Sequence, residues 1–170
     1  MVCLSARRVP LERRELRDDD VAVRVDHCGV CHSDLHAIRG ATGGPKGPLV
    51  PGHKFTGTAT AVGAAATAFA VGDRVAVGTV VDSCGTCPMC EVGQENFCFE
   101  FPTTTYNGTD RVDGTRTQGG YSREYVLREK FAYPCPSVWT RPPQPRSCAP
   151  GSPCGNPCAR PASDRTAASP

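Results

Sequence analysis

The sequence predicts a mainly β, barrel-like domain over residues 1 to about 133, on three observations. Short runs of β-branched or small residues recur along this part, glycines interrupt them at close intervals, and the one helix candidate is modest. With 170 residues in all, the chain is long enough for one ordinary domain of about 100 to 150 residues and too short for two.

Four segments have the composition of strands. The first is the nearly alternating run Val-Ala-Val-Arg-Val, which follows an acidic turn, and the second and third are separated by an alanine-rich stretch and a Gly-Asp turn. The predicted strands are residues 21–25, 55–63, 74–81 and 121–127, and the helix candidate is residues 31–38.

Residues 134–170 differ in composition from the rest of the chain. Ten of the sixteen prolines lie at or after Pro134, and Val138 and Trp139 are the only large apolar side chains there. Such a segment buries too little apolar surface to offset its conformational entropy, so we expect a disordered tail. The Arg/Pro/Ala/Ser/Cys mixture also resembles GC-rich DNA translated out of frame, a hypothesis that the nucleotide sequence around codons 130 to 140 would test.

Charge and cysteine content narrow the class of protein. The net charge of +2 provides no basic surface for nucleic acid or an anionic membrane, and neither a signal peptide nor a membrane span is recognisable. We therefore expect a cytoplasmic protein. Eleven cysteines could form a secreted disulfide scaffold, but the odd total and the tight CxxC spacings favour thiolates that bind metal.

The strongest signal is a set of four cysteines within fifteen positions, in a lobe spanning about residues 82–100. Zn²⁺ prefers a tetrahedral shell, and a CxxC turn presents two sulfurs to one ion. A four-cysteine shell has no open position, so the sequence predicts a structural zinc site; the alternative is disulfides or idle core thiols. The four ligands are Cys84, Cys87, Cys90 and Cys98.

A second group of candidate ligands lies upstream. The run His27-Cys28-Gly29-Val30-Cys31-His32-Ser33-Asp34-Leu35-His36 is followed by Pro51-Gly52-His53. A cysteine and a distant histidine can share a catalytic zinc that keeps one position open for a substrate oxygen. On spacing alone, a hydrogen-bonded structural histidine is the competing interpretation.

In their order along the chain, these residues resemble the zinc-dependent medium-chain alcohol dehydrogenases, and among them the cinnamyl-alcohol-dehydrogenase-like group. The resemblance runs from about Leu11 to Tyr133. It rests on Cys28 to His36, Pro51-Gly52-His53, Gly72-Asp73-Arg74-Val75, Val81-Asp82-Ser83-Cys84-Gly85 through Cys98, and Gly119-Gly120-Tyr121-Ser122.

The resemblance implies a GroES-like β-barrel catalytic domain with a structural and a catalytic zinc, normally packed against a Rossmann domain that holds NADP. The implied activity is the interconversion of primary alcohols and aldehydes, with a small-molecule substrate between the two domains. Carried over residue by residue, Cys31 and His53 match catalytic zinc ligands, and Ser33 matches the hydroxyl that takes the proton of the alcohol. The remaining matched positions are His36 in the proton relay, His32 near the cofactor pyrophosphate, and Asp34, which orients the histidine ligand.

The sequence departs from the family at three points. Lys54 stands where the family usually has glutamate after Gly-His. Its positive charge would oppose Zn²⁺; the alternative is that the side chain extends outward with little effect on the site. No residue matches the third catalytic zinc ligand, and neither Cys135 nor Cys148 has the expected neighbours. No GxGxxG fingerprint follows a strand, so we expect the chain alone to be inactive.

Three readings of function follow. The first is the catalytic domain of a zinc-dependent, NADP-linked alcohol dehydrogenase. The second is a non-catalytic, truncated zinc-binding domain that retains only the structural site. The third, a secreted disulfide-rich module, fits the cysteine spacings and the N-terminus poorly. The sequence leaves the particular alcohol and the oligomeric state open.

Overall fold

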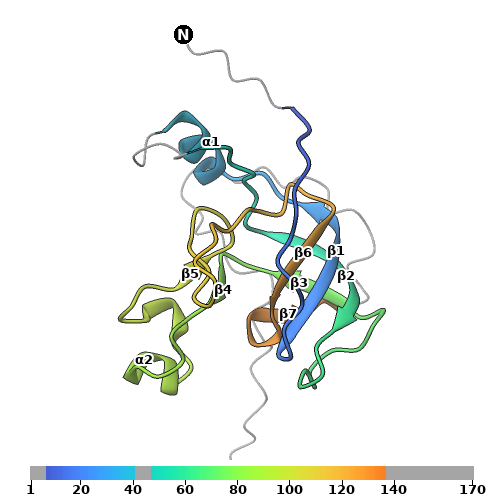
Figure 1. Ribbon diagram of the computed structural model, residues 1–170, viewed down its shortest axis with the longest axis vertical. Coiled ribbons are helices and arrows are strands. Elements are labelled where there is room, and N and C mark those ends of the chain that lie inside the picture. The colour runs from blue at the N-terminus through green and yellow to red at the C-terminus, as the bar shows by residue number, and fades with distance from the viewer. Residues whose placement is uncertain (1–6, 41–46, 137–170) are drawn as a thin grey trace, which may run out of the picture. The chain divides into compact units, whose positions relative to one another are not determined.

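The computed structural model describes residues 7–40 and 47–136 (Figure 1). In these ranges short strands dominate and the helices are few. The strands are β1 (Asp20–Cys28), β2 (Phe55–Val62), β3 (Arg74–Val77), β4 (Val80–Asp82), β5 (Thr103–Thr104), β6 (Glu124–Arg128) and β7 (Ala132–Pro134). The helices are α1 (His32–Arg39) and α2 (Pro88–Glu91), with single 3-10 turns η1 (Glu95–Phe97) and η2 (Glu129–Phe131).

Five strands form one antiparallel sheet in the order β6-β1-β2-β3-β7, and β4 and β5 form a separate two-stranded ladder. In Figure 1 the large sheet occupies one side, α1 lies at its upper end, and α2 lies beyond β4 and β5. Bulges interrupt the β1–β2 ladder after Ala22 and again between Val25 and His27. Because bulges increase local twist, they curve the sheet into a half-barrel, and the mainly β, barrel-like class predicted from the sequence is confirmed.

The predicted strand over residues 74–81 is two strands in the structure, β3 and β4. They are separated by Gly78 and Thr79, whose carbonyls both accept hydrogen bonds from Thr105. The chain therefore leaves the large sheet at this point and pairs with β5 instead. Strand-like composition runs through both segments, so the sequence alone did not reveal the switch of partner.

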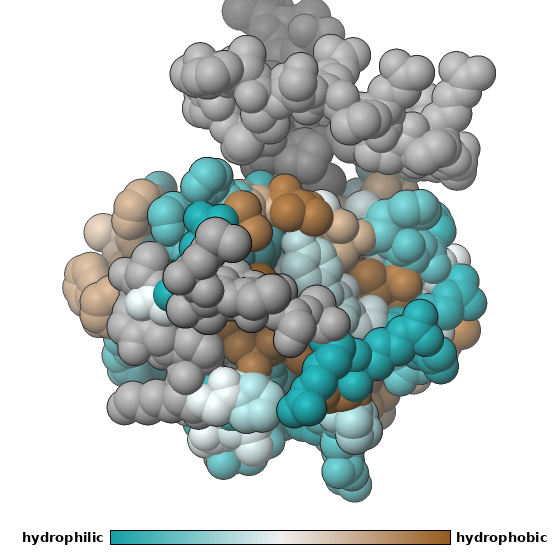
Figure 2. All heavy atoms as spheres, turned by 90° about the horizontal axis from the view of Figure 1, so that it is seen from above, coloured by the Kyte–Doolittle hydropathy of each residue, from teal (hydrophilic) through white to brown (hydrophobic). Residues whose placement is uncertain are grey.

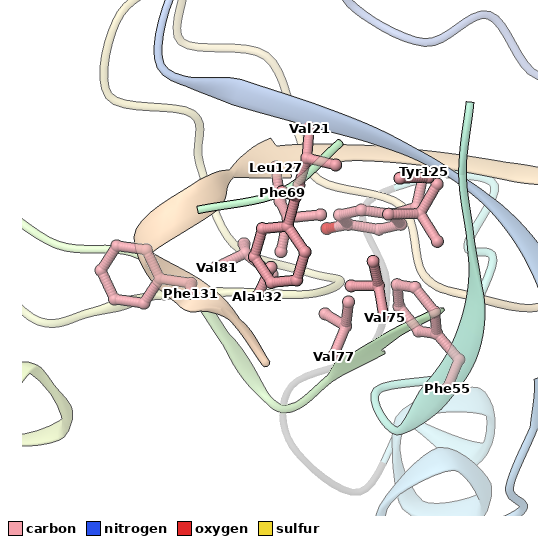
Figure 3. Packing of buried hydrophobic residues seen from close by; sticks show 12 residues of the cluster. Val21, Phe55, Phe69, Val75, Val77, Val81, Tyr125, Leu127, Phe131 and Ala132 are labelled. Carbon is pink, nitrogen blue, oxygen red and sulfur yellow. The ribbon is translucent and has the colours of Figure 1, made fainter. Parts of the chain in front are cut away.

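Side chains from both sheets and from the connecting segments meet in one hydrophobic core (Figure 3). On β1, Val21 and Val23 are fully buried, as expected for alternate residues that point to the same face of a strand. Leu127 of β6 and Val75 of β3 are equally inaccessible. The other buried members of the cluster are Phe55, Ala59, Phe69, Val77, Val81, Tyr125, Phe131 and Ala132.

The segment before β1 is anchored by arginines rather than by regular structure. The Arg13 guanidinium donates to the carbonyls of Glu124 and Gly119, each at 2.8 Å, and to the Ser122 hydroxyl at 2.6 Å. It also lies 4.5 Å from the centre of the Tyr125 ring, in cation–π geometry. Arg13 therefore fastens the N-terminal segment across the edge strand β6.

A second arginine group ties the same segment to a distant turn. Arg17 binds Asp110 through two hydrogen bonds of 3.0 and 2.9 Å, and Arg14 Nε lies 3.2 Å from the same carboxylate. Arg14 also pairs with Asp20, which is fully buried at the start of β1. Asp110 therefore links residues more than ninety positions apart in the chain.

The described structure continues slightly past the predicted domain end at residue 133. Strand β7 ends at Pro134, and the Cys135 amide donates to the Arg74 carbonyl at 3.0 Å. The predicted disordered or out-of-frame tail lies outside the described residues from 137 onward. Within the described ranges, no helix is both long and apolar enough to cross a membrane.

The coloured part of the upper face shows hydrophobic residues in separate patches among hydrophilic ones (Figure 2). Several large apolar side chains of the described chain are exposed, among them Val30 and three phenylalanines near α2. The phenylalanines are Phe97, Phe99 and Phe101, and together with Met89 and Pro102 they line a shallow apolar hollow on the cysteine-rich lobe.

Candidate metal centres

Short elements bring the four cysteines of the lobe together. Cys84 follows β4, and Cys87 and Cys90 lie at the start and inside of α2, which begins at Pro88. Cys98 follows η1. Gly85 and Gly93 each have φ of 76°, a left-handed conformation that glycine adopts without steric cost and that turns the chain back toward the sulfurs.

The spacing of the four sulfurs fits a tetrahedral metal ion. All four lie within 4.8 Å of one another, and Cys90 Sγ is 3.5 Å from Cys87 Sγ and 3.8 Å from Cys84 Sγ. Four sulfurs bound at about 2.3 Å to a tetrahedral zinc are separated by about 3.8 Å, so the two short separations match a zinc shell and the 4.8 Å limit is close to it. The predicted convergence of these four residues is therefore present.

Backbone amides favour thiolates at this position. Hydrogen bonds from the amides of Thr86 and Cys87 lower the pKa of Cys84 to about 6, and the Phe99 amide lowers the pKa of Cys87. At Cys90 the nearby Ser83 hydroxyl acts in the same direction, but burial and the adjacent sulfurs outweigh it and raise the pKa to about 11. Closely spaced sulfurs resist losing all their protons unless a cation joins them, as a zinc ion would.

The second constellation is organised by Asp34. Helix α1 begins at His32, and Asp34 in its first turn accepts a hydrogen bond of 2.9 Å from the Cys31 amide, which is half of a capping box. The same carboxylate accepts from the Gly52 amide at 3.0 Å and faces His53 Nδ1 at 3.1 Å. Burial alone would raise the pKa of Asp34, but these partners lower it, so the group is an anion at neutral pH.

His53 is thus held at one ring nitrogen. With Nδ1 on Asp34, Nε2 is the nitrogen left for a metal ion, and this arrangement is typical of histidine ligands in zinc sites. Gly52 makes the approach possible: its φ is 99°, and a Cβ there would lie 2.8 Å from both Cys28 Sγ and the Tyr121 amide nitrogen. A side chain at this position would displace the loop that carries His53.

Cys31 lies at the exposed end of this arrangement. Its Sγ is 3.7 Å from the Ser33 hydroxyl, and the pKa of its thiol is lowered, first by a hydrogen bond from the Ser33 amide. The positive charge of Lys54 lowers the same pKa further, which places the unexpected lysine close enough to influence the sulfur. His32 and His36 are exposed on α1, with ring centres 4.9 Å apart.

The described residues offer the upstream pair no third metal-binding side chain. Among them, the only group of three or more candidate ligands is the four-cysteine cluster. Cys135 follows β7 and its amide is bonded to Arg74, while Cys148 lies outside the described ranges. Catalytic zinc sites usually have three protein ligands, so Cys31 and His53 alone would fall one short of such a site.

Two tyrosines beside Asp34 were not among the predicted site residues. The Tyr121 hydroxyl donates to Asp34 Oδ2 at 3.3 Å, and the Tyr106 ring centre is 5.7 Å from that of His53. Burial and the Asp34 charge raise the pKa of Tyr106 to about 12 and also raise that of Tyr121. Tyr121 belongs to the matched motif Gly119-Gly120-Tyr121-Ser122, but neither tyrosine has metal-ligand spacing, so the sequence assigned no site role to either.

Comparison with known proteins gives consistent matches. The chain matches the family described as "Alcohol dehydrogenase GroES-like domain" over residues 17–137. It is 46% identical over 129 residues to cinnamyl alcohol dehydrogenase 7 of Oryza sativa subsp. japonica, covering 76% of this chain and 34% of that protein. Identity to a probable formaldehyde dehydrogenase of Bacillus subtilis is also 46%, over 74% of this chain and 36% of the relative.

Solved structures agree with these matches. A cinnamyl alcohol dehydrogenase of Sorghum bicolor superposes with a TM-score of 0.72 at 41% identity, covering 75% of this chain and 36% of that one. The Helicobacter pylori enzyme of the same kind, complexed with NADP(H), gives 0.68 at 33% identity, over 72% of this chain and 35% of that one. The chain thus spans about a third of the length of the relatives it matches.

Proposed function

This chain belongs to the zinc-dependent alcohol dehydrogenase family, and from that premise we propose that it is the N-terminal catalytic domain of an NADP-linked oxidoreductase of primary alcohols and aldehydes. The single observation that carries the metal part of the proposal is the close approach of four cysteine sulfurs, all within 4.8 Å of one another. In this proposal they hold a structural zinc that shapes the lobe at residues 82–100 and takes no part in chemistry.

The catalytic part of the proposal rests on Cys31 and His53 as two ligands of a second zinc. Such an ion, when bound, supplies a Lewis acid for the oxygen of the alcohol or aldehyde. Asp34 fixes the orientation of His53 through Nδ1, and the capping hydrogen bond to the Cys31 amide fixes where α1 begins. One carboxylate therefore positions both ligands.

Ser33 and His36 would move the proton of the alcohol. Both are exposed on α1, and the Ser33 hydroxyl is 3.7 Å from Cys31 Sγ. Ser33 would accept the proton and His36 would pass it to solvent. His32, beside His36, is proposed to lie near the cofactor pyrophosphate.

The choice of NADP follows the Helicobacter pylori relative, which is complexed with NADP(H). We propose that the 170 residues by themselves transfer no hydride, because they contain no glycine fingerprint for a dinucleotide. Incubation of the chain with NADPH and an aromatic aldehyde tests this, and zinc-dependent turnover would refute it. A cytoplasmic location is part of the same proposal, in keeping with the seven free thiols in the described residues.

A second candidate function is a zinc-binding domain without catalytic activity. Two observations favour it: the described residues place no third ligand with Cys31 and His53, and the Lys54 charge acts on the Cys31 sulfur. Zinc content measured by atomic emission separates the candidates. Two ions per chain would support the catalytic site, and one ion that persists in a Cys31→Ser variant would leave only the structural centre.

A further inference from the structure

A cation that the proposed function does not use lies beside the four-cysteine cluster. Arg111 follows the Asp110 turn, and its Nη2 is 4.0 Å from Cys98 Sγ. The same nitrogen donates to the Glu100 carbonyl at 3.2 Å and to the Phe101 carbonyl. The guanidinium therefore contacts both a sulfur of the cluster and the chain that leaves it.

The Arg111 guanidinium is partly buried, although the carboxylate paired with it is exposed. Its side chain is 23% exposed, and within the described part of the chain its buried Nε has no hydrogen-bond partner. The carboxylate paired with it, Glu100, is 65% exposed and contacts only the outer nitrogen Nη1, at 3.1 Å. A partly buried cation needs negative charge nearby, and on its inner side Cys98 Sγ would provide it as a thiolate.

The cluster needs positive charge in turn. A zinc ion with four thiolates has a net charge of about −2, and two of the four sulfurs, those of Cys90 and Cys98, are buried. Arg111 and a third cysteine of the cluster, Cys84, line one hollow of about 310 Å³. A guanidinium 4.0 Å from Cys98 Sγ would offset part of the charge that water cannot reach.

Arg111 also fixes the end of the lobe. Phe101, three residues after Cys98, has φ of 58°, a left-handed conformation that is unfavourable for a bulky side chain. The hydrogen bonds from Arg111 to the carbonyls on either side of this bend hold it in place. The position of Cys98 thus depends on the same side chain that faces its sulfur.

We propose that Arg111 is a positioning residue of the four-cysteine metal centre, which sets how tightly the ion is held by balancing the thiolate charge and fixing the segment after Cys98. The inference rests on the proposed structural zinc site and adds a determinant of its affinity. Residues outside the ligand shell that orient ligands change metal affinity by about 10- to 100-fold when mutated, and we expect Arg111→Gln to weaken zinc binding by that factor.

The test is zinc affinity of the full chain, measured at one pH by competition with a chromophoric chelator. Arg111→Gln removes the charge, and Arg111→Lys restores it without the forked geometry. The matched control is Arg116→Gln, because Arg116 lies in the same loop but bonds to Asn107 and to no sulfur. Glu100→Gln removes the competing carboxylate and should leave binding as tight as in the wild type or tighter.

Cobalt substitution adds a readout that loss of packing alone would not change. The sulfur-to-cobalt charge-transfer band should shift in Arg111→Gln and stay in place in Arg116→Gln. Intermediate affinity for Arg111→Lys would support the charge contribution.

Three results would overturn the inference: an Arg111→Gln affinity within about twofold of wild type, equal losses in the Lys and Gln variants, or weaker binding in Glu100→Gln. The last comparison remains informative if Arg111→Gln does not fold. A wild-type chain that binds no zinc at all would refute the metal centre itself, which is a different outcome.

Discussion

Replacing Asp110 by asparagine should destabilise the chain by an amount that depends on pH. The carboxylate is 9% exposed and receives two hydrogen bonds from Arg17, together with the amides of Val112 and Asp113. Burial alone would raise the pKa of Asp110, but these donors outweigh it and lower the pKa from 3.8 to about 2. Asparagine keeps the shape of the aspartate side chain and removes its charge. The Asp110→Asn variant therefore measures the electrostatic contribution of Asp110 to stability.

The magnitude follows from that difference in pKa. At about 1.4 kcal/mol per pH unit, the ionised Asp110 contributes about 2 to 3 kcal/mol to the free energy of unfolding at pH 7. A lowered folded-state pKa means that the contribution is complete above about pH 4 and is lost as pH falls toward about 2. The difference in free energy of unfolding between wild type and Asp110→Asn should therefore fall to about half its pH 7 value by pH 3.

Urea unfolding followed by circular dichroism at pH 7, 5, 4 and 3 measures this difference directly. Asp18→Asn is the matched control, because Asp18 is an exposed carboxylate in the turn before β1. A difference that stays constant between pH 7 and pH 3 would show that the loss comes from shape or hydrogen-bond geometry and would refute the electrostatic reasoning. An Asp18→Asn variant as unstable as Asp110→Asn would do the same.

Three further perturbations probe other parts of the structure. Leu127→Ala should lower the free energy of unfolding in urea by about 3 to 4 kcal/mol, because Leu127 is 1% exposed in the core. A loss below about 1 kcal/mol would mean that the core packs differently. Arg13→Ala removes hydrogen bonds to β6 and a cation–π contact, so it should lower the free energy of unfolding by about 2 kcal/mol. Arg13→Lys should lose less stability than Arg13→Ala. If neither variant is less stable than the wild type, Arg13 does not anchor the segment. Cys90→Ser should remove one zinc ion per chain and lower the melting temperature, and an unchanged zinc content would show that the four sulfurs do not share an ion.

The sequence was informative wherever short-range pattern decides structure. Alternation around Val21 and Val23 identified β1, and the spacing of Cys84, Cys87, Cys90 and Cys98 identified the cluster, because a tight turn and a metal shell both depend on residues close in sequence. The helix candidate over 31–38 differs from α1 by one residue at each end. These features need no knowledge of the tertiary fold.

What the sequence did not reveal depends on contacts between distant residues. Arg13, Arg17 and Arg111 are ordinary charged residues in the chain, and their roles follow from partners that folding brings to them. Tyr121 meets Asp34 across 87 positions. The pairing of β4 with β5 was also missed, because a two-residue strand such as Thr103–Thr104 carries no recognisable period.

The crossing from β3 to β4 has a mechanical consequence. Only Gly78 and Thr79 separate the end of β3, in the large sheet, from the β4–β5 ladder that leads into the cysteine-rich lobe. This point can therefore act as a boundary between two cooperative units. Stripping the metal with a chelator would then open the lobe locally while the valines of β1 stay packed. In hydrogen–deuterium exchange, amides around residues 84–98 should lose protection at once, and those of β1 should exchange only when the whole sheet unfolds.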